Sequence, residues 1–229
     1  MPAKTVQNAP KPFDWAWIDW AAVRAMFAAS EPIVLTIGYG NAGAAERLDN
    51  PAVLRGIAQG FGATVIADCR AQPGGARIRA GWSQGLVKEA LADGPAYTWQ
   101  GDRLGGKDRH RGRGCTPDGL KWLDAAAQDG NIVLLCACSD RGTCHLHRLV
   151  ATDLQREDKR AEMGLSGTGP RFVHLHLDGS WTGGGTMLEA TDEGLTYPAE
   201  TLPVLPEYRE KADKWRAIYT EGEAMMPDE

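Results

Sequence analysis

Short apolar runs alternate with amphipathic segments along most of the chain. The runs at residues 33–37, 63–68, 96–99, 132–136 and 172–177 read as strands. Most are nearly continuous in apolar residues and bounded by glycine or charged residues, which is typical of parallel strands buried on both faces. The segments between them carry apolar residues at helical spacing. This alternation predicts an α/β fold: a mainly parallel sheet flanked by helices on both faces, as a three-layer α/β/α arrangement.

Capping residues mark the start of several predicted helices. Asn50 and the proline after it begin one helix, Ser83 precedes a second, and Thr116 begins a third. A further helix is expected over residues 144–156. The charged, glycine-rich segment 157–170 is expected to be a loop.

The chain divides into three parts by composition. Residues 1–30 hold a polar tail and a helix with Trp15, Trp17 and Trp20, which we expect to pack as a lid on the core. Residues 31–180 form the α/β core domain. Residues 181–229 form a C-terminal extension that ends in a helix.

Composition places the chain among ordinary globular proteins. It has 229 residues, 43% of them hydrophobic, and a net charge of −5, which argues against a generally basic protein that coats nucleic acid. No run approaches the roughly 20 apolar residues of a membrane-spanning helix, and the N-terminus lacks the apolar stretch of a secretory signal. The five clustered cysteines suit reduced thiols. We therefore expect a cytoplasmic protein with no membrane partner.

Chemically capable side chains follow the predicted strands. They occur at residues 38–41, 68–70, 104–107 and 136–145. Because the carboxyl ends of parallel strands meet at one edge of a sheet, we expect these segments to lie close together. Open α/β sheets bind their ligands at this edge.

The motifs at these strand ends also carry a resemblance. They are Thr36-Ile37-Gly38-Tyr39, Ala67-Asp68-Cys69-Arg70, Leu104-Gly105-Gly106, and Leu134-Leu135-Cys136 followed by Cys144-His145. Their order over residues 33 to 155 resembles the domain of unknown function 488 family. The resemblance supports one site built from these strand ends, and it implies no particular reaction.

Four residues are candidates for catalysis: Cys144, His145, Asp68 and Cys136. A thiol at a helix N-terminus beside a histidine has a lowered pKa, which favours Cys144 as a nucleophile. Asp68 is a candidate acid/base group. The alternatives are structural: Cys136 as a packed thiol, and Asp68 as the partner of Arg70 in an ion pair.

A second set of residues is suited to binding an anion. The segment 103–113 holds five cations on an otherwise acidic protein, which suggests a polyanionic partner. Its glycines match neither the Walker A pattern nor the G-x-G-x-x-G turn. The candidate ligand-binding residues are Tyr39, Asn41, Arg70, Gly105, Gly106, Lys107, Arg109, Arg111 and Arg141.

The cysteines and histidines also suggest a metal. Cys136, Cys138, Cys144 and His145 could bind zinc or iron, although their spacing lacks the paired C-x2-C of known structural zinc sites.

Three functional hypotheses follow. The first is an enzyme acting on a phosphate-bearing substrate, a nucleotide or nucleic acid, at the Cys/His/Asp/Arg site. The alternative is a non-catalytic nucleotide- or nucleic-acid-binding protein that uses the basic loop and stacks bases on Tyr39 and Trp99. The second alternative is a Cys/His metal or redox module.

Overall fold

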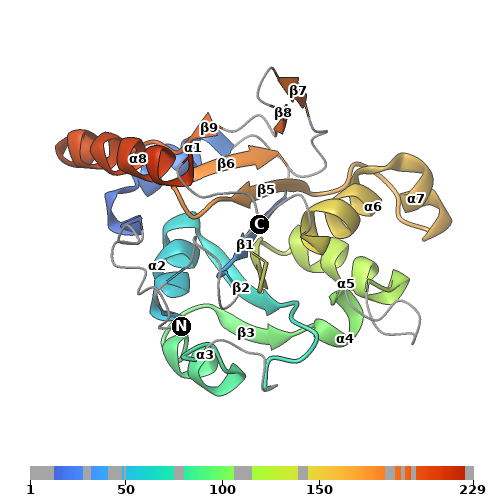
Figure 1. Cartoon of the computed structure of the whole chain (residues 1–229). Coiled ribbons are helices and arrows are strands. Elements are labelled where there is room, and N and C mark those ends of the chain that lie inside the picture. Colours follow the sequence, from blue (N-terminus) through green and yellow to red (C-terminus); the bar gives the residue numbers. More distant parts are fainter. Residues whose placement is uncertain are drawn as a thin grey trace, which may run out of the picture.

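A seven-stranded sheet forms the centre of the molecule in the computed structural model (Figure 1). The structure describes residues 13–27, 32–40, 48, 50–74, 80–105, 115–138, 144–183, 189–191, 194–196 and 200–224. The strand order is β3-β2-β4-β1-β5-β6-β9. The strands are β1 (Ile33–Gly38), β2 (Ala63–Asp68), β3 (Ala96–Trp99), β4 (Asn131–Cys136), β5 (Arg171–Leu175), β6 (Ser180–Gly183) and β9 (Glu200–Thr201).

The first five strands of this order are parallel, and β6 and β9 extend the sheet as antiparallel strands. The predicted α/β fold class is confirmed. The antiparallel extension was not predicted, because β6 and β9 are short and lack an apolar run. A separate hairpin joins β7 (Glu189–Thr191) and β8 (Gly194–Thr196).

Helices cover both faces of the sheet and bury two apolar clusters. In β1, Leu35 and Ile37 point into the first cluster and Val34 into the second, as the alternation of a strand requires. The helices on the first face are η1 (Trp15–Trp17), α1 (Trp20–Phe27), α2 (Ala52–Phe61) and α3 (Gln84–Ala90). Those on the second face are α5 (Pro117–Gln128), the π-helix η3 (Leu146–Ala151) and α6 (Thr152–Gln155). The remaining helices are α4 (Gly101–Leu104), α7 (Glu157–Glu162), η4 (Pro206–Tyr208) and α8 (Arg209–Ala224).

The helices that follow β1 and β4 lie on opposite faces of the sheet. The helix after β1 is α2, on the first face, and the helix after β4 is η3, on the second. The two strands are hydrogen-bonded neighbours, with Gly38 opposite Cys136. Neighbouring strands whose connections diverge in this way create the crevice in which α/β sheets place their sites.

Thr116 is the N-cap of α5 as predicted, whereas the N-cap of α2 is Pro51, one residue after the predicted Asn50. The Asn50 side chain accepts from the Ala52 N–H at 2.9 Å, and Thr116 accepts from the Gly119 N–H at 3.1 Å. The predicted loop at 157–170 is wrong in its first part, because residues 157–162 form α7. The predicted helix after Cys144 begins as a π-helix.

The tryptophan-rich N-terminal segment packs on the first face. Trp15 is buried, and Trp20 stacks on it with ring centroids 6.4 Å apart. Gly60 of α2 lets the Trp20 ring lie directly against this helix, because a Cβ on Gly60 would overlap the ring. Among the described helices, none is both long and apolar enough to cross a membrane.

Candidate metal centre

Three cysteines and one histidine converge at the carboxyl end of β4. They are Cys136 at the strand end, Cys138 in the loop after it, and Cys144 and His145 immediately before η3. Their ligand atoms all lie within 4.8 Å of one another. Cys136 and Cys144 are buried, and Cys138 and His145 are half-buried. This cluster could hold a metal ion.

One distance within the cluster matches that expected around a tetrahedral ion. The Sγ of Cys136 lies 3.6 Å from Nδ1 of His145. Zinc bonds of about 2.3 Å to sulfur and about 2.0 Å to nitrogen, at tetrahedral angles, place these two atoms roughly 3.6 Å apart. The other ring nitrogen of His145, Nε2, is buried and has no hydrogen-bond partner in the described chain.

Gly38 makes room for this cluster. A Cβ on Gly38 would overlap the carbonyl oxygen of Cys138. The neighbouring chain therefore crosses directly over the end of β1, where the N–H of Cys138 donates to Sγ of Cys136 at 3.4 Å. Steric exclusion of a side chain thus explains why the Ile-Gly-Tyr motif has glycine at its second position.

The three thiols have very different pKa values. Hydrogen bonds from Cys136, Cys144 and His145 lower the pKa of Cys138 strongly. The hydrogen bond to Cys138 is the largest cause that raises the pKa of Cys136. A hydrogen bond from Cys136 lowers the pKa of Cys144, but its bond to Cys138 and its burial outweigh this effect and raise the value to about 12.

The expected lowering of the Cys144 pKa is therefore wrong. The hydrogen bond with Cys138 and the burial of the thiol raise this pKa, and that prediction considered neither. A bound cation would favour deprotonation of all three thiols.

Asp68 and Arg70 form a buried ion pair at the end of β2. Nε and Nη2 of Arg70 donate to the two carboxylate oxygens of Asp68 at 2.8 and 2.6 Å, and Nη1 donates to the carbonyl of Trp82. Tyr97 also donates its hydroxyl to Asp68 at 2.6 Å. Of the two interpretations of this pair, the structure shows the ion pair, with the guanidinium bonded within the protein.

The two aromatic candidates differ in exposure. Tyr39 is buried and stacks on Trp82, with ring centroids 4.3 Å apart and planes at 8°. The guanidinium of Arg70 also lies 5.4 Å from the centroid of the Tyr39 ring. Trp99 is 38% exposed and donates its ring N–H to the carbonyl of Arg70 at 2.9 Å. Of these two, Trp99 alone offers an exposed ring.

Gly105 has a packing role. A Cβ there would overlap the carbonyl oxygen of Gly101, so the glycine lets α4 close against the chain that follows it. The remaining anion-binding candidates lie outside the described residues: Asn41, Gly106, Lys107, Arg109, Arg111 and Arg141.

A row of buried histidines beneath η3 was not predicted as part of the site. The rings of His147 and His176 lie 5.5 and 5.4 Å from that of His174, which is between them. His174 is hydrogen-bonded to Thr36 through Nδ1, and His176 to Thr182 at 3.2 Å. The sequence signal was present, since two histidines alternate within an apolar strand, but the partner elements depend on the strand order.

Comparison of the chain with protein-family models, with curated proteins and with solved structures gave no match. The resemblance to the domain of unknown function 488 family stays a prediction.

Proposed function

We propose that this protein binds one zinc ion through Cys136, Cys138, Cys144 and His145. The observation that carries the proposal is the convergence of the four ligand atoms within 4.8 Å, from two segments of the chain. Thiolate and imidazole are the donors that zinc prefers in proteins, and three thiolates with one imidazole complete a tetrahedral shell.

A complete protein shell supports a structural role for the ion. Catalytic zinc sites keep a position open for water, whereas structural sites use four protein ligands. Here the ion would tie the end of β4 to the start of η3. It would thereby hold together the edge at which the connections of β1 and β4 diverge.

Metal analysis of the purified protein tests the proposal. We expect about one zinc per chain, and we expect Cys138→Ser to weaken zinc binding by about a hundredfold or more, because the half-buried thiol is a ligand. Metal content and competition with a chelator provide the measurement.

Cys115→Ser is the matched control. Cys115 is also half-buried and lies just before α5, outside the four-residue cluster. This variant should retain the zinc. A native protein without metal, or equal loss in both variants, would refute the proposal.

The position of the site supports a second proposal. The helices after β1 and β4 lie on opposite faces, and α/β proteins bind phosphate-bearing ligands at such a point of the sheet. An enzyme or binding protein for a nucleotide or nucleic acid therefore fits the same edge. Salt-sensitive binding of a labelled single-stranded oligonucleotide, weakened by Arg109→Ala with Arg111→Ala, would support this function. Binding that neither change alters would exclude a role for the basic loop.

A further inference from the structure

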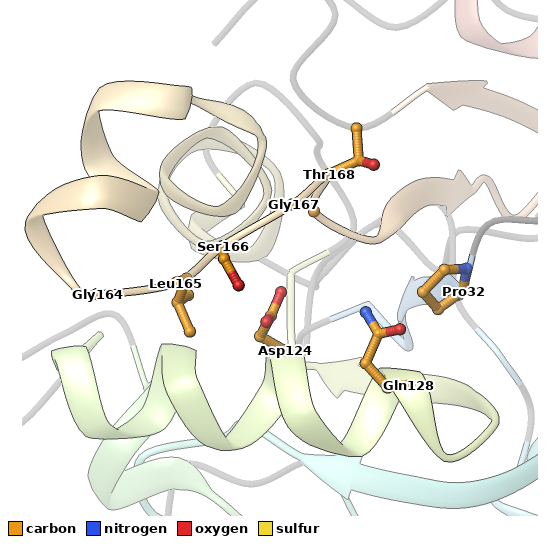
Figure 2. A pocket seen from close by; sticks show the side chains of 9 residues that line it. Pro32, Asp124, Gln128, Gly164, Leu165, Ser166, Gly167 and Thr168 are labelled. Atoms are coloured by element: carbon orange, nitrogen blue, oxygen red, sulfur yellow. The ribbon is translucent and has the colours of Figure 1, made fainter.

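A surface pocket lies at the edge of the sheet opposite to the metal centre (Figure 2). Its volume is about 550 Å³. One wall is the last part of α5, a second is the loop of residues 164–169, and Pro32, immediately before β1, borders the third side. Because α5 leads into β4, this is the amino-terminal edge of the parallel strands.

Asp124 forms the polar floor of the pocket. Its residue surface is 9% exposed, and its Oδ1 accepts from Nη1 of Arg160 at 2.6 Å. The other carboxylate oxygen has no partner within the described chain. The ion pair cancels the two charges, so the floor offers a hydrogen-bond acceptor with little net charge.

Arg160 also fixes the loop that faces this carboxylate. Its Nε and Nη2 donate to the carbonyls of Gly167 and Ser166 at 3.1 and 3.0 Å. In a trans peptide the N–H points opposite to the carbonyl, so the N–H groups of Gly167 and Thr168 point away from the guanidinium. Neither N–H has an acceptor among the described residues. Arg160 therefore ties the loop to the carboxylate of Asp124.

Two side chains add hydrogen-bonding capacity. Gln128 extends from α5 toward the loop, and the hydroxyl of Ser166 is directed toward Asp124 (Figure 2). Neither side chain has a hydrogen-bond partner within the part of the chain that the structure describes. The ring of Pro32 offers an apolar surface beside these groups.

We infer that this pocket binds a neutral polyhydroxyl compound of monosaccharide size. Neighbouring hydroxyl groups both donate and accept, which matches the carboxylate oxygen of Asp124, the amide of Gln128 and the hydroxyl of Ser166 around one cavity. The C–H groups of such a ligand can pack against the apolar ring of Pro32. The cancelled charge of Asp124 and Arg160 disfavours an ionic ligand. The inference is independent of the metal centre.

A titration followed by two-dimensional NMR of ¹⁵N-labelled full-length protein tests the inference. D-Glucose, D-ribose and myo-inositol serve as separate probes. At least one should shift the amide signals of residues 166–169 and the Gln128 side chain saturably, with a Kd of about a millimolar. Gln128→Ala should weaken that binding by about fivefold to tenfold, because it removes a hydrogen-bonding group without disturbing a buried contact.

Lys121→Ala, at an exposed position of the same helix, should leave the affinity unchanged. Three outcomes would overturn the inference: no saturable shift with any of the three probes, equal affinity in Gln128→Ala, or tighter binding of glucose 6-phosphate than of glucose. The last would show an anion site.

Discussion

Gly38 illustrates how one residue without a side chain can determine a site. It lies where Cys138 crosses the end of β1, and the overlap of any Cβ involves backbone atoms that no rotamer change can move. We expect Gly38→Ala to displace Cys138 and to weaken zinc binding by about tenfold or more, although no ligand changes. Chelator competition provides the measurement.

Gly56→Ala is the control for this prediction. Gly56 lies within α2, and no atom lies within 4 Å of a Cβ built there. Alanine in a helix interior is favoured over glycine by about 0.5–1 kcal/mol, so this variant should be slightly more stable and should bind zinc normally. Equal zinc affinity in the two variants would show that the crossing does not position Cys138.

The Asp68–Arg70 pair should matter for stability. The exposed fractions of the Arg70 and Asp68 side chains are 2% and 0%. Asp68→Asn leaves the guanidinium buried without a counter-charge, which costs about 3–5 kcal/mol in the free energy of unfolding. Urea unfolding measures this loss. Lys214→Ala is the exposed control: it breaks the ion pair with Glu210, in which the Lys214 and Glu210 side chains are 72% and 82% exposed. This variant should change the free energy of unfolding by less than about 1 kcal/mol.

Tyr97 makes the same network sensitive to alkali. Burial, and then the hydrogen bond to Asp68, raise the pKa of Tyr97 above its ordinary 10.0. The associated stability is fully present below pH 10 and is lost as the pH rises through the raised value, because the unfolded chain releases its proton first. In urea unfolding, Tyr97→Phe should be less stable at neutral pH and should show a smaller fall above about pH 10. An unchanged fall would assign the alkaline sensitivity to other groups.

At the scale of elements, the π-helix η3 connects the proposed metal centre to the buried histidines. It begins directly after His145 and carries His147 on its inner side, next to His174. The sequence predicts a helix here but not its type. Turns of π-helix often occur at functional sites.

Removal of zinc should therefore affect η3 before other helices. We expect a chelator to speed amide hydrogen exchange in residues 146–151 by about tenfold or more, because the ion anchors the start of this helix. Helix α5 packs on the same face and begins at Thr116 with its own cap, so its exchange should change little. Equal acceleration in both helices would indicate global loosening.

At the scale of the whole molecule, the sequence predicts the parallel core well. The strands β1 to β5 occur at the predicted runs. The signal is continuous for β1 and β4, which are buried along their length, whereas the edge strand β3 has no buried residue. The sequence did not predict the strand order. That order depends on long-range pairing, and it places β4 between β2 and β1.

The dependence on long-range pairing also explains which parts of the site the sequence predicts. The cluster of Cys136, Cys144 and His145 was predicted because its members are close in sequence and follow a strand. The choice between anion clamp and ion pair at Arg70 required the positions of Asp68 and Trp82. Prediction of the row of His147, His174 and His176 required knowledge of which elements lie next to β5.

Zinc K-edge X-ray absorption of the purified protein reports directly on the four proposed ligands. We expect a first shell of three sulfur atoms at about 2.3 Å and one nitrogen at about 2.0 Å. In Cys138→Ser that holds residual zinc, the sulfur count should fall to two. A shell of only oxygen and nitrogen, or an unchanged spectrum in the variant, would contradict the assignment of these four ligands.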